Sequence, residues 1–285
     1  MEIKKIAVLG AGTMGNGITQ VSAQSTFKVT MYDIDQKFLD RGMNSIKKNL
    51  GRSVEKGRMS QGDMDVTMSR ISTSLSLKET VADADLVIES VPEIMDLKKD
   101  IFKQLDEICP KDTILASNSS GLSISEIASV TSRPDKVLGM HFWNPAFLMK
   151  LVEIIKGVDT SEETLNNVVA VGKAMGKEPV VAKDSAGFCG NRIGCPMINE
   201  AFFALGEGIA SAEDIDKAMH FGWNHPMGPL ALADMIGLDI MVNVMNYFHK
   251  EMGDKYRPAP LMVQLVRAGR LGRKTGKGVY DYTQK

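Results

Sequence analysis

Short apolar runs alternate with segments of helical spacing over the first two-thirds of the chain. The apolar runs, each bounded by polar residues, are 6–9, 27–32, 85–89, 113–116, 136–141, 151–155 and 179–182. Runs of this length and composition are typical of strands in a buried parallel sheet. Helical spacing occupies the segments 35–58, 96–108 and 161–175. The pattern predicts an α/β fold with a doubly wound, mostly parallel sheet, and the long charged segment 35–58 is expected to project from that sheet.

The pattern changes after about residue 184. Residues 189–249 have helical spacing and no strand signal, with breaks near the middle at Gly222, Pro226, Gly228 and Pro229. The sequence therefore predicts an α/β domain over residues 1–183 and an all-helical domain over 184–285. The expected helix 229–249 carries more apolar residues than one face needs. Burial within one copy of the chain and an interface between copies both explain this surplus.

A glycine motif joins the first two predicted strands. The strand 6–9 runs into Gly10-x-Gly12-x-x-Gly15, a helical segment follows, and the second strand ends at Asp33, 18 residues after Gly15. Gly10 permits a tight turn, Gly12 lets a pyrophosphate approach the backbone, and Gly15 lets the helix pack against the sheet. The helix N-terminus then faces the phosphates.

This motif predicts a Rossmann-type dinucleotide-binding unit. A carboxylate at Asp33 accepts hydrogen bonds from an adenosine ribose but repels a 2′-phosphate, which favours NAD over NADP. FAD binds a similar unit and remains the alternative cofactor at this point.

Bulk properties exclude several other classes. Lys+Arg 34 against Asp+Glu 35 gives a net charge of −1 over 285 residues, so no basic field points to nucleic acid or a membrane surface. Three cysteines without a CxxC pair indicate free thiols in a reducing cytoplasm. We expect no signal peptide, because the chain enters its first strand near Ile3, and no membrane span, because no run of about 18 apolar residues occurs.

A bound nicotinamide needs a group that moves a proton, and His141 is the candidate. It ends a predicted strand, and ligands of open α/β sheets lie beyond strand carboxyl ends. If the following strand is adjacent, Glu153 faces His141 and stabilises its imidazolium form; otherwise Glu153 is a surface charge.

Of three polar segments, the first two allow two interpretations each. Residues 117–121 (SNSSG) suit a substrate-binding loop or a helix N-cap before 124–130. Asn191 caps a helix or presents its amide to a substrate at a domain cleft. The Gly- and Lys-rich segment 272–278 is a solvated turn on residue type alone.

Taken together, these segments resemble the L-3-hydroxyacyl-CoA dehydrogenase family, and most of all its short bacterial members that act on 3-hydroxybutyryl-CoA. The resemblance extends from Ile3 to Tyr282. The matching segments, in the family's order, are Gly10–Gly15, Ser117–Ser120, His141-Phe-Trp-Asn-Pro145, Met149-Lys-Leu-Val-Glu153, Gly187-Phe-x-x-Asn191-Arg192 and Pro226-Met-Gly-Pro-Leu230.

The resemblance implies a role for each matching residue. His141 is similar to the catalytic histidine and Glu153 to its carboxylate partner, while Ser120 and Asn191 match residues that hold the substrate. Lys56 aligns with a lysine that meets the CoA phosphates. The positions that match cofactor-binding residues are Gly10, Gly12, Thr13, Met14, Gly15, Asp33, Glu93, Lys98, Asn144 and Lys274. The match of Lys274 replaces the interpretation of its segment as a plain solvated turn.

Three positions depart from the family's usual HFFNPxPxMKLVE pattern and the serine pair before it. Trp143 replaces a phenylalanine, Phe147 replaces a proline, and Gly121 stands where a serine is usual. All three are expected near the reacting centre, where they affect the acyl-chain preference.

The resemblance implies reversible, NAD-linked interconversion of an (S)-3-hydroxyacyl-CoA and its 3-oxoacyl-CoA, a step of fatty-acid and butyrate metabolism. The expected partners are the acyl-CoA and a second copy of the chain, in a homodimer or a higher homo-oligomer, with no nucleic acid and no membrane. No metal is expected. The alternatives are a dehydrogenase of a free 3-hydroxy acid without CoA, and a nucleotide-sensing protein without catalysis.

Overall fold

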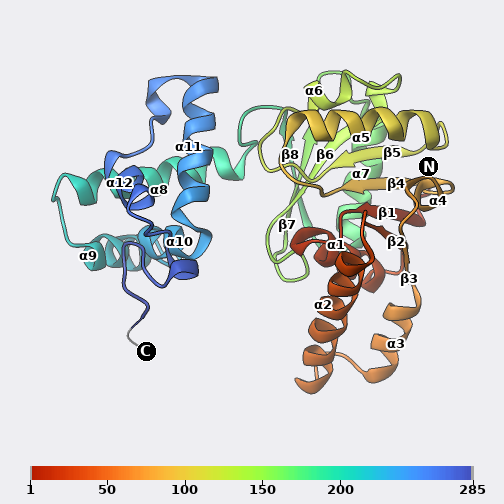
Figure 1. Ribbon diagram of the computed structural model, residues 1–285, viewed down its shortest axis with the longest axis horizontal. Helices are drawn as coiled ribbons and strands as arrows, with labels where there is room; N and C mark the ends of the chain where they lie inside the picture. Colours follow the sequence, from red (N-terminus) through yellow and green to blue (C-terminus); the bar gives the residue numbers. More distant parts are fainter. Residues whose placement is uncertain (1, 284–285) are drawn as a thin grey trace. The chain divides into compact units, whose positions relative to one another are not determined.

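The computed structural model describes residues 2–283. The chain divides into two compact units, Met1–Ser185 and Ala186–Lys285. Figure 1 shows strands with covering helices in the first unit and helices in the second.

The first unit contains an eight-stranded sheet in the order β3-β2-β1-β4-β5-β6-β7-β8. Its strands are β1 (Lys5–Leu9), β2 (Lys28–Tyr32), β3 (Ile71–Ser74), β4 (Leu86–Glu89), β5 (Ile114–Ser117), β6 (Val137–Phe142), β7 (Leu151–Lys156) and β8 (Glu178–Lys183). Neighbouring strands are parallel except for β6 and β7, which are antiparallel. The predicted doubly wound, mostly parallel sheet is confirmed.

Helices cover both faces of this sheet (Figure 1). On one face, α1 (Thr13–Gln24) and α7 (Glu162–Ala174) pack their apolar side chains, among them Ile18 and Val168, on the central strands. On the other face lie α5 (Met95–Ile108) and α6 (Ile124–Ala128). A short helix, α4 (Leu77–Val81), precedes β4. The strands between the two layers are buried on both sides, which explains their nearly continuous apolar sequences.

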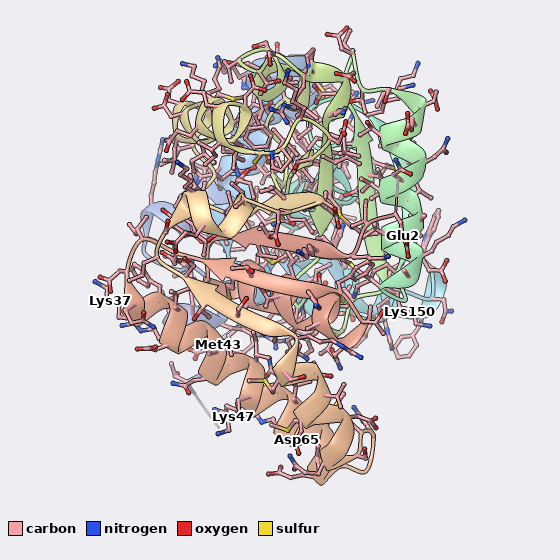
Figure 2. All side chains as sticks on the ribbon, turned by 90° about the vertical axis from the view of Figure 1, so that its right-hand side faces the viewer. Glu2, Lys37, Met43, Lys47, Asp65 and Lys150 are labelled. Carbon is pink, nitrogen blue, oxygen red and sulfur yellow. The ribbon has the colours of Figure 1, made fainter. Side chains whose placement is uncertain are left out.

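Two helices form an arm that extends beyond the sheet. Figure 2 shows α2 (Gln36–Glu55) with Lys37, Met43 and Lys47, and α3 (Gln61–Ser69) with Asp65. The projecting helix was predicted, whereas α3 and β3 were not, because their short segments carry few apolar residues. The arm has a small core of its own, in which Met64 packs on Ile46 and Leu50. A capping box between Ser60 and Asp63 starts α3.

The second unit is helical, as the sequence predicts. Its α-helices are α8 (Gly190–Gly206), α9 (Ala212–Lys217), α10 (Pro229–Ile236), α11 (Leu238–Met252) and α12 (Pro260–Arg267). A π-helical turn, Ala218–Gly222, extends α9. Phe202, Leu230, Met241, Met245 and Phe248 lie in its apolar core.

The prediction of one helix over 229–249 was wrong. The segment forms α10 and α11, which are bent by 99° at Gly237. Gly237 has φ +111°, a conformation that residues with a Cβ rarely adopt, so the helix ends there. Each helix buries a different apolar face, which accounts for much of the apolar surplus. Within residues 2–283 no single helix has the length and apolar content of a membrane span, although this bent pair has both when taken together.

Candidate active site

The candidate residues of the first unit follow the carboxyl ends of parallel strands. The glycine loop follows β1, Asp33 follows β2, Glu93 lies in the loop after β4, Ser120 follows β5, and His141 lies at the end of β6. β1 lies between β2 and β4. From β1 the chain first forms β2 and β3 on one side, and then crosses back to add β4 to β8 on the other side of β1. Ligands of open α/β sheets bind beyond the strand ends at such a switch point.

The glycine loop has the geometry that a dinucleotide pyrophosphate needs. Gly10 has φ +96°, and a Cβ there would lie 2.8 Å from the carbonyl oxygen of Ser90. A Cβ on Gly15 would lie 1.7 Å from the carbonyl oxygen of Gly10, whereas a Cβ on Gly12 would enter open space. Gly12 is the N-cap of α1 and makes no side-chain capping bond, so Thr13 and Met14 begin the helix with backbone N–H groups suited to a phosphate.

Asp33 is fixed beside this loop. Its Oδ2 accepts a hydrogen bond from the Ala11 backbone N–H at 2.8 Å, and its Oδ1 accepts one from Ile34 at 2.7 Å. Each carboxylate oxygen has a second lone pair for a ribose hydroxyl. A negative carboxylate here would repel a 2′-phosphate, so the residues present fit NAD better than NADP.

His141 and Glu153 form a buried pair. They lie opposite each other in the antiparallel β6–β7 register, and the His141 Nδ1 is 2.8 Å from the Glu153 Oε2. Their side chains are 8% and 1% exposed. Glu153 is therefore not a surface charge, which was the alternative interpretation. A carboxylate at Nδ1 orients the ring, and a pair of this kind can move a proton at Nε2.

A second donor reaches the same carboxylate oxygen. The Trp143 indole Nε1 lies 3.3 Å from Glu153 Oε2, and the Trp143 and His141 ring centroids are 5.7 Å apart. Sequence reasoning assigned no role to this N–H. The available signal was spacing, since residues 141 and 143 fall on the same side of an extended chain.

Glu93 accepts hydrogen bonds from the serine loop that follows β5. Its Oε1 accepts hydrogen bonds from the Ser119 Oγ at 2.6 Å, the Ser120 backbone N–H at 2.8 Å and the Ser120 Oγ at 3.2 Å. Burial favours the neutral acid, but the Lys98 charge and these hydrogen bonds outweigh it and hold the pKa of Glu93 below its ordinary value. Glu93 therefore stays ionised while it positions Ser120.

Lys98 lies beneath Glu93. Its side chain is 1% exposed, and its Nζ lies 2.7 Å from Glu89 Oε1 and 3.3 Å from Glu93 Oε2. Glu89 is fully buried and also accepts hydrogen bonds from Ser117 Oγ and the Val91 N–H, each at 2.7 Å. Lys98 is therefore linked to the candidate site by its ion pair with Glu93. Sequence reasoning did not identify Glu89, which ends an otherwise apolar strand.

The helix-capping interpretations of two segments were wrong. The N-cap of α6 is Ser123, which accepts from the Glu126 N–H, rather than a residue of the 117–121 loop. The N-cap of α8 is Cys189, so Asn191 lies within the first turn of that helix. In the 117–121 loop, Asn118 accepts from the Phe142 N–H at 2.8 Å and links the ends of β5 and β6.

The remaining candidates lie elsewhere in the chain. In the second unit, the 272–278 segment packs its end glycines on buried Asp234, since a Cβ on Gly278 would lie 1.9 Å from its Oδ1. Arg273, Lys274, Thr275 and Lys277 are exposed, so the segment is a turn that is solvated in its middle and packed at its ends. Lys274 in this segment forms an ion pair with Asp239 at 2.6 Å. In the first unit, Lys56 is exposed at the end of α2 on the arm. Exposed Asn144 follows β6 at the sheet edge.

A proton-transfer pair at the same sheet edge as a dinucleotide loop is the arrangement of an NAD-linked oxidoreductase. The comparisons identify the family. Residues 5–185 match the NAD-binding domain of 3-hydroxyacyl-CoA dehydrogenase, and residues 187–282 match the C-terminal domain of the same enzymes. The chain therefore belongs to the 3-hydroxyacyl-CoA dehydrogenase family, and its cofactor is NAD.

Close relatives cover the chain from end to end. A probable 3-hydroxybutyryl-CoA dehydrogenase of Bacillus subtilis is 51% identical over 100% of this chain and 99% of its own length. A 3-hydroxybutyryl-CoA dehydrogenase of Clostridioides difficile is 49% identical over 98% of this chain and 100% of its own. The crystal structure of (S)-3-hydroxybutyryl-CoA dehydrogenase PaaH1 from Ralstonia eutropha matches with a TM-score of 0.97 and 48% identity, covering 99% of this chain and 100% of that one.

Proposed function

We propose that this protein interconverts short-chain (S)-3-hydroxyacyl-CoA and 3-oxoacyl-CoA, with 3-hydroxybutyryl-CoA as the natural substrate. The observation that carries the proposal is the buried His141–Glu153 pair at the sheet edge where NAD binds. The names of the relatives supply the substrate class.

His141 is the general base of the oxidation. NAD, when bound, would supply the acceptor for the hydride that leaves C3 of the substrate. The His141 Nε2 takes the hydroxyl proton as the C3–O bond becomes a carbonyl, and it returns that proton in the reduction. Glu153 stabilises the imidazolium form of His141. A positioned general base of this kind contributes roughly 10²–10⁴-fold to the rate.

The other candidate residues divide between substrate and cofactor. Ser120 hydrogen-bonds the substrate near the reacting oxygen, and Asn191 helps to hold the thioester. Glu93, with Lys98 beneath it, and Asn144 line the nicotinamide half of NAD. Lys274 binds the cofactor. The exposed position of Lys56 on the arm supports a contact with the CoA phosphates.

Phe147 and Trp143 follow the catalytic strand and favour a short acyl chain. Phe147 is half-buried in the loop between β6 and β7, where its ring occupies volume that a proline would not. A series of 3-oxoacyl-CoA substrates of increasing length tests this point. We expect the highest kcat/KM at four carbons, and a maximum at longer chains would contradict the preference.

The homo-oligomer remains part of the proposal. Met235, Ile236 and Ile240, on α10 and α11, keep 37–48% of their surface exposed in the second unit, which supports an interface between copies there. Sedimentation velocity at micromolar concentration tests it, and a purely monomeric protein would contradict it.

NADH oxidation by acetoacetyl-CoA, compared with free acetoacetate, tests the proposed reaction. We expect turnover with the CoA ester and little with the free acid; the reverse preference would show a dehydrogenase of free 3-hydroxy acids. In the same assay, His141→Gln should lower kcat by at least ~100-fold with NADH affinity unchanged. His249→Gln is the matched control, because His249 is a surface residue paired with Asp254. NADH binding without turnover of any acyl-CoA would indicate a nucleotide-sensing protein.

A further inference from the structure

Trp143 and His141 contact the same oxygen atom. The indole N–H of Trp143 points to Glu153 Oε2 at 3.3 Å, while His141 Nδ1 lies 2.8 Å from that oxygen. The two rings are tilted by 47° to each other. The carboxylate on which proton transfer depends therefore receives a neutral donor in addition to the histidine.

The backbone on both sides of Trp143 is held in place. On one side, Asn118 Oδ1 accepts the Phe142 N–H at 2.8 Å. On the other side, the buried Lys177 side chain donates to the carbonyl oxygens of Ala146 and Met149. These contacts fix the segment that carries the indole, so the approach to Glu153 follows from the fold around it.

A neutral donor has two physical effects on a buried carboxylate. It stabilises the ionised form, which burial disfavours, and it restricts the orientation of the carboxylate plane. It also draws electron density from the shared oxygen, so that the same carboxylate attracts a neighbouring proton less strongly. Phenylalanine at position 143 would keep an aromatic ring there but would provide neither effect.

We propose that Trp143 is a positioning residue for the catalytic pair, which holds Glu153 Oε2 against His141 and moderates the stabilisation of the imidazolium form. This inference rests on the proposed function, since it assigns the indole N–H a role in the same proton transfer. A variant that lacks this N–H should therefore differ in the pH dependence of the reaction.

Several charged groups on the neighbouring elements of the first unit have partners of their own. Val180 of β8, which is uncharged, lies opposite Glu153. The charged groups nearby, with their partners, are Glu126 of α6 with Lys99, Asp184 after β8 with Ser123 and Ser125, Glu162 of α7 with Lys156, and Glu93 with Lys98. The comparison of Trp143→Phe with its control variant therefore isolates the part of the pH response that depends on the indole N–H.

The hydrogen bond itself can be measured by nuclear magnetic resonance of the ¹⁵N-labelled protein. The chain has 2 tryptophans, so two indole N–H signals are expected, and the signal lost in Trp143→Phe belongs to Trp143. Glu153→Gln replaces the charged acceptor by a neutral one and should move this signal upfield. The matched control Glu162→Gln changes an exposed glutamate of α7 and should leave it in place. An unmoved Trp143 signal in Glu153→Gln would overturn the proposal.

The pH profile of Trp143→Phe then tests the consequence. Without the indole N–H, Glu153 attracts the imidazolium proton more strongly, so the acid limb of kcat/KM for alcohol oxidation should move up by about 0.3–1 pH unit. NADH affinity should stay the same. Trp223→Phe is the control, because Trp223 is 75% exposed. An unmoved acid limb, with only a uniform loss of kcat, would show that the indole merely packs.

Failure of this inference is distinguishable from failure of the proposed function. Full turnover in His141→Gln removes the proton-transfer role of the pair, whatever Trp143 does. A severe loss in His141→Gln together with an unmoved Trp143→Phe profile removes only the role of the indole. If Trp143→Phe does not fold, the signal lost in Trp223→Phe identifies the other indole, and the remaining signal belongs to Trp143. The response of that signal to Glu153→Gln then decides the question.

Discussion

His141 and Glu153 lie opposite each other across the one antiparallel strand pair of the described sheet, with Nδ1 2.8 Å from Oε2. The reversal between β6 and β7 makes this contact, since it returns the chain to the carboxyl edge of the parallel strands. Both residues belong to adjoining strands with a single connecting loop. The pair is thus fixed by sheet register, and its geometry depends on backbone pairing rather than on loop conformation.

Asp33→Ala should weaken NADH binding about 10- to 100-fold, because one or two hydrogen bonds between a charged carboxylate and the ribose are lost. Fluorescence titration with NADH measures the change. The KM for acetoacetyl-CoA should change far less. Asp65→Ala, at an exposed site on the arm, is the control and should leave NADH binding intact. Equal weakening of both ligands in Asp33→Ala would argue for general damage to the fold.

Substitution of the loop glycines should separate stability from binding. Gly15→Ala places a Cβ within 1.7 Å of the Gly10 carbonyl oxygen and should cost about 1–3 kcal/mol or more of unfolding free energy. Gly12→Ala meets no atom within 4 Å, so it should fold normally but bind NADH poorly. Gly51→Ala, in an open position on α2, should stabilise the protein by about 0.5–1 kcal/mol. Urea unfolding and NADH titration of all three variants measure these effects, and a stable Gly15→Ala would be the contradictory result.

Removal of the buried lysine should leave a buried carboxylate without its charged partner. Lys98→Met should cost about 3–5 kcal/mol of unfolding free energy. The double variant Glu89→Gln/Lys98→Met should be more stable than Lys98→Met, because the uncompensated charge of Glu89 is gone. Denaturant unfolding of the two single variants and the double variant gives the coupling. Simple addition of the two single losses would mean that Glu89 and Lys98 are not coupled in solution.

Ser119→Ala should make stability less dependent on the ionisation of Glu93. The folded-state pKa of Glu93 is lowered from 4.5, so its hydrogen bonds stabilise the fold above that value and the contribution is lost as the pH falls through the lower folded-state value. The loss in Ser119→Ala should therefore be about 1 kcal/mol at pH 7, allowing for solvent screening of half-exposed Glu93, and should shrink toward pH 3. Unfolding curves at both pH values provide the check. A loss that grows on acidification would reverse the sign of this account.

Much of the first unit follows from local pattern. The strand runs, the glycine motif and Asp33 define a nucleotide-binding unit, because the glycines are needed for the turn and the pyrophosphate and the carboxylate is needed for the ribose. The sequence predicts that Glu153 faces His141 only if β7 lies beside β6. No local signal shows that these strands are adjacent. That adjacency depends on tertiary pairing across 12 positions of the chain.

Other features depend on contacts that the sequence pattern does not encode. Glu89 sits in an apolar strand and is recognisable only once Lys98 is found beside it. The break at Gly237 interrupts a continuous apolar pattern, and one glycine within a helical segment is often tolerated. The bond from Trp143 to Glu153 requires the exact direction of an indole ring, which spacing limits only to one side of the strand.

The most direct test of the central claim is a double-mutant cycle on kcat for acetoacetyl-CoA reduction, with His141→Gln, Glu153→Gln and the double variant. We expect a loss of at least ~100-fold in His141→Gln, a smaller loss in Glu153→Gln, and a double variant no slower than His141→Gln, because Glu153 acts through His141. Losses that multiply independently in the double variant, or near-normal turnover in His141→Gln, would contradict the account.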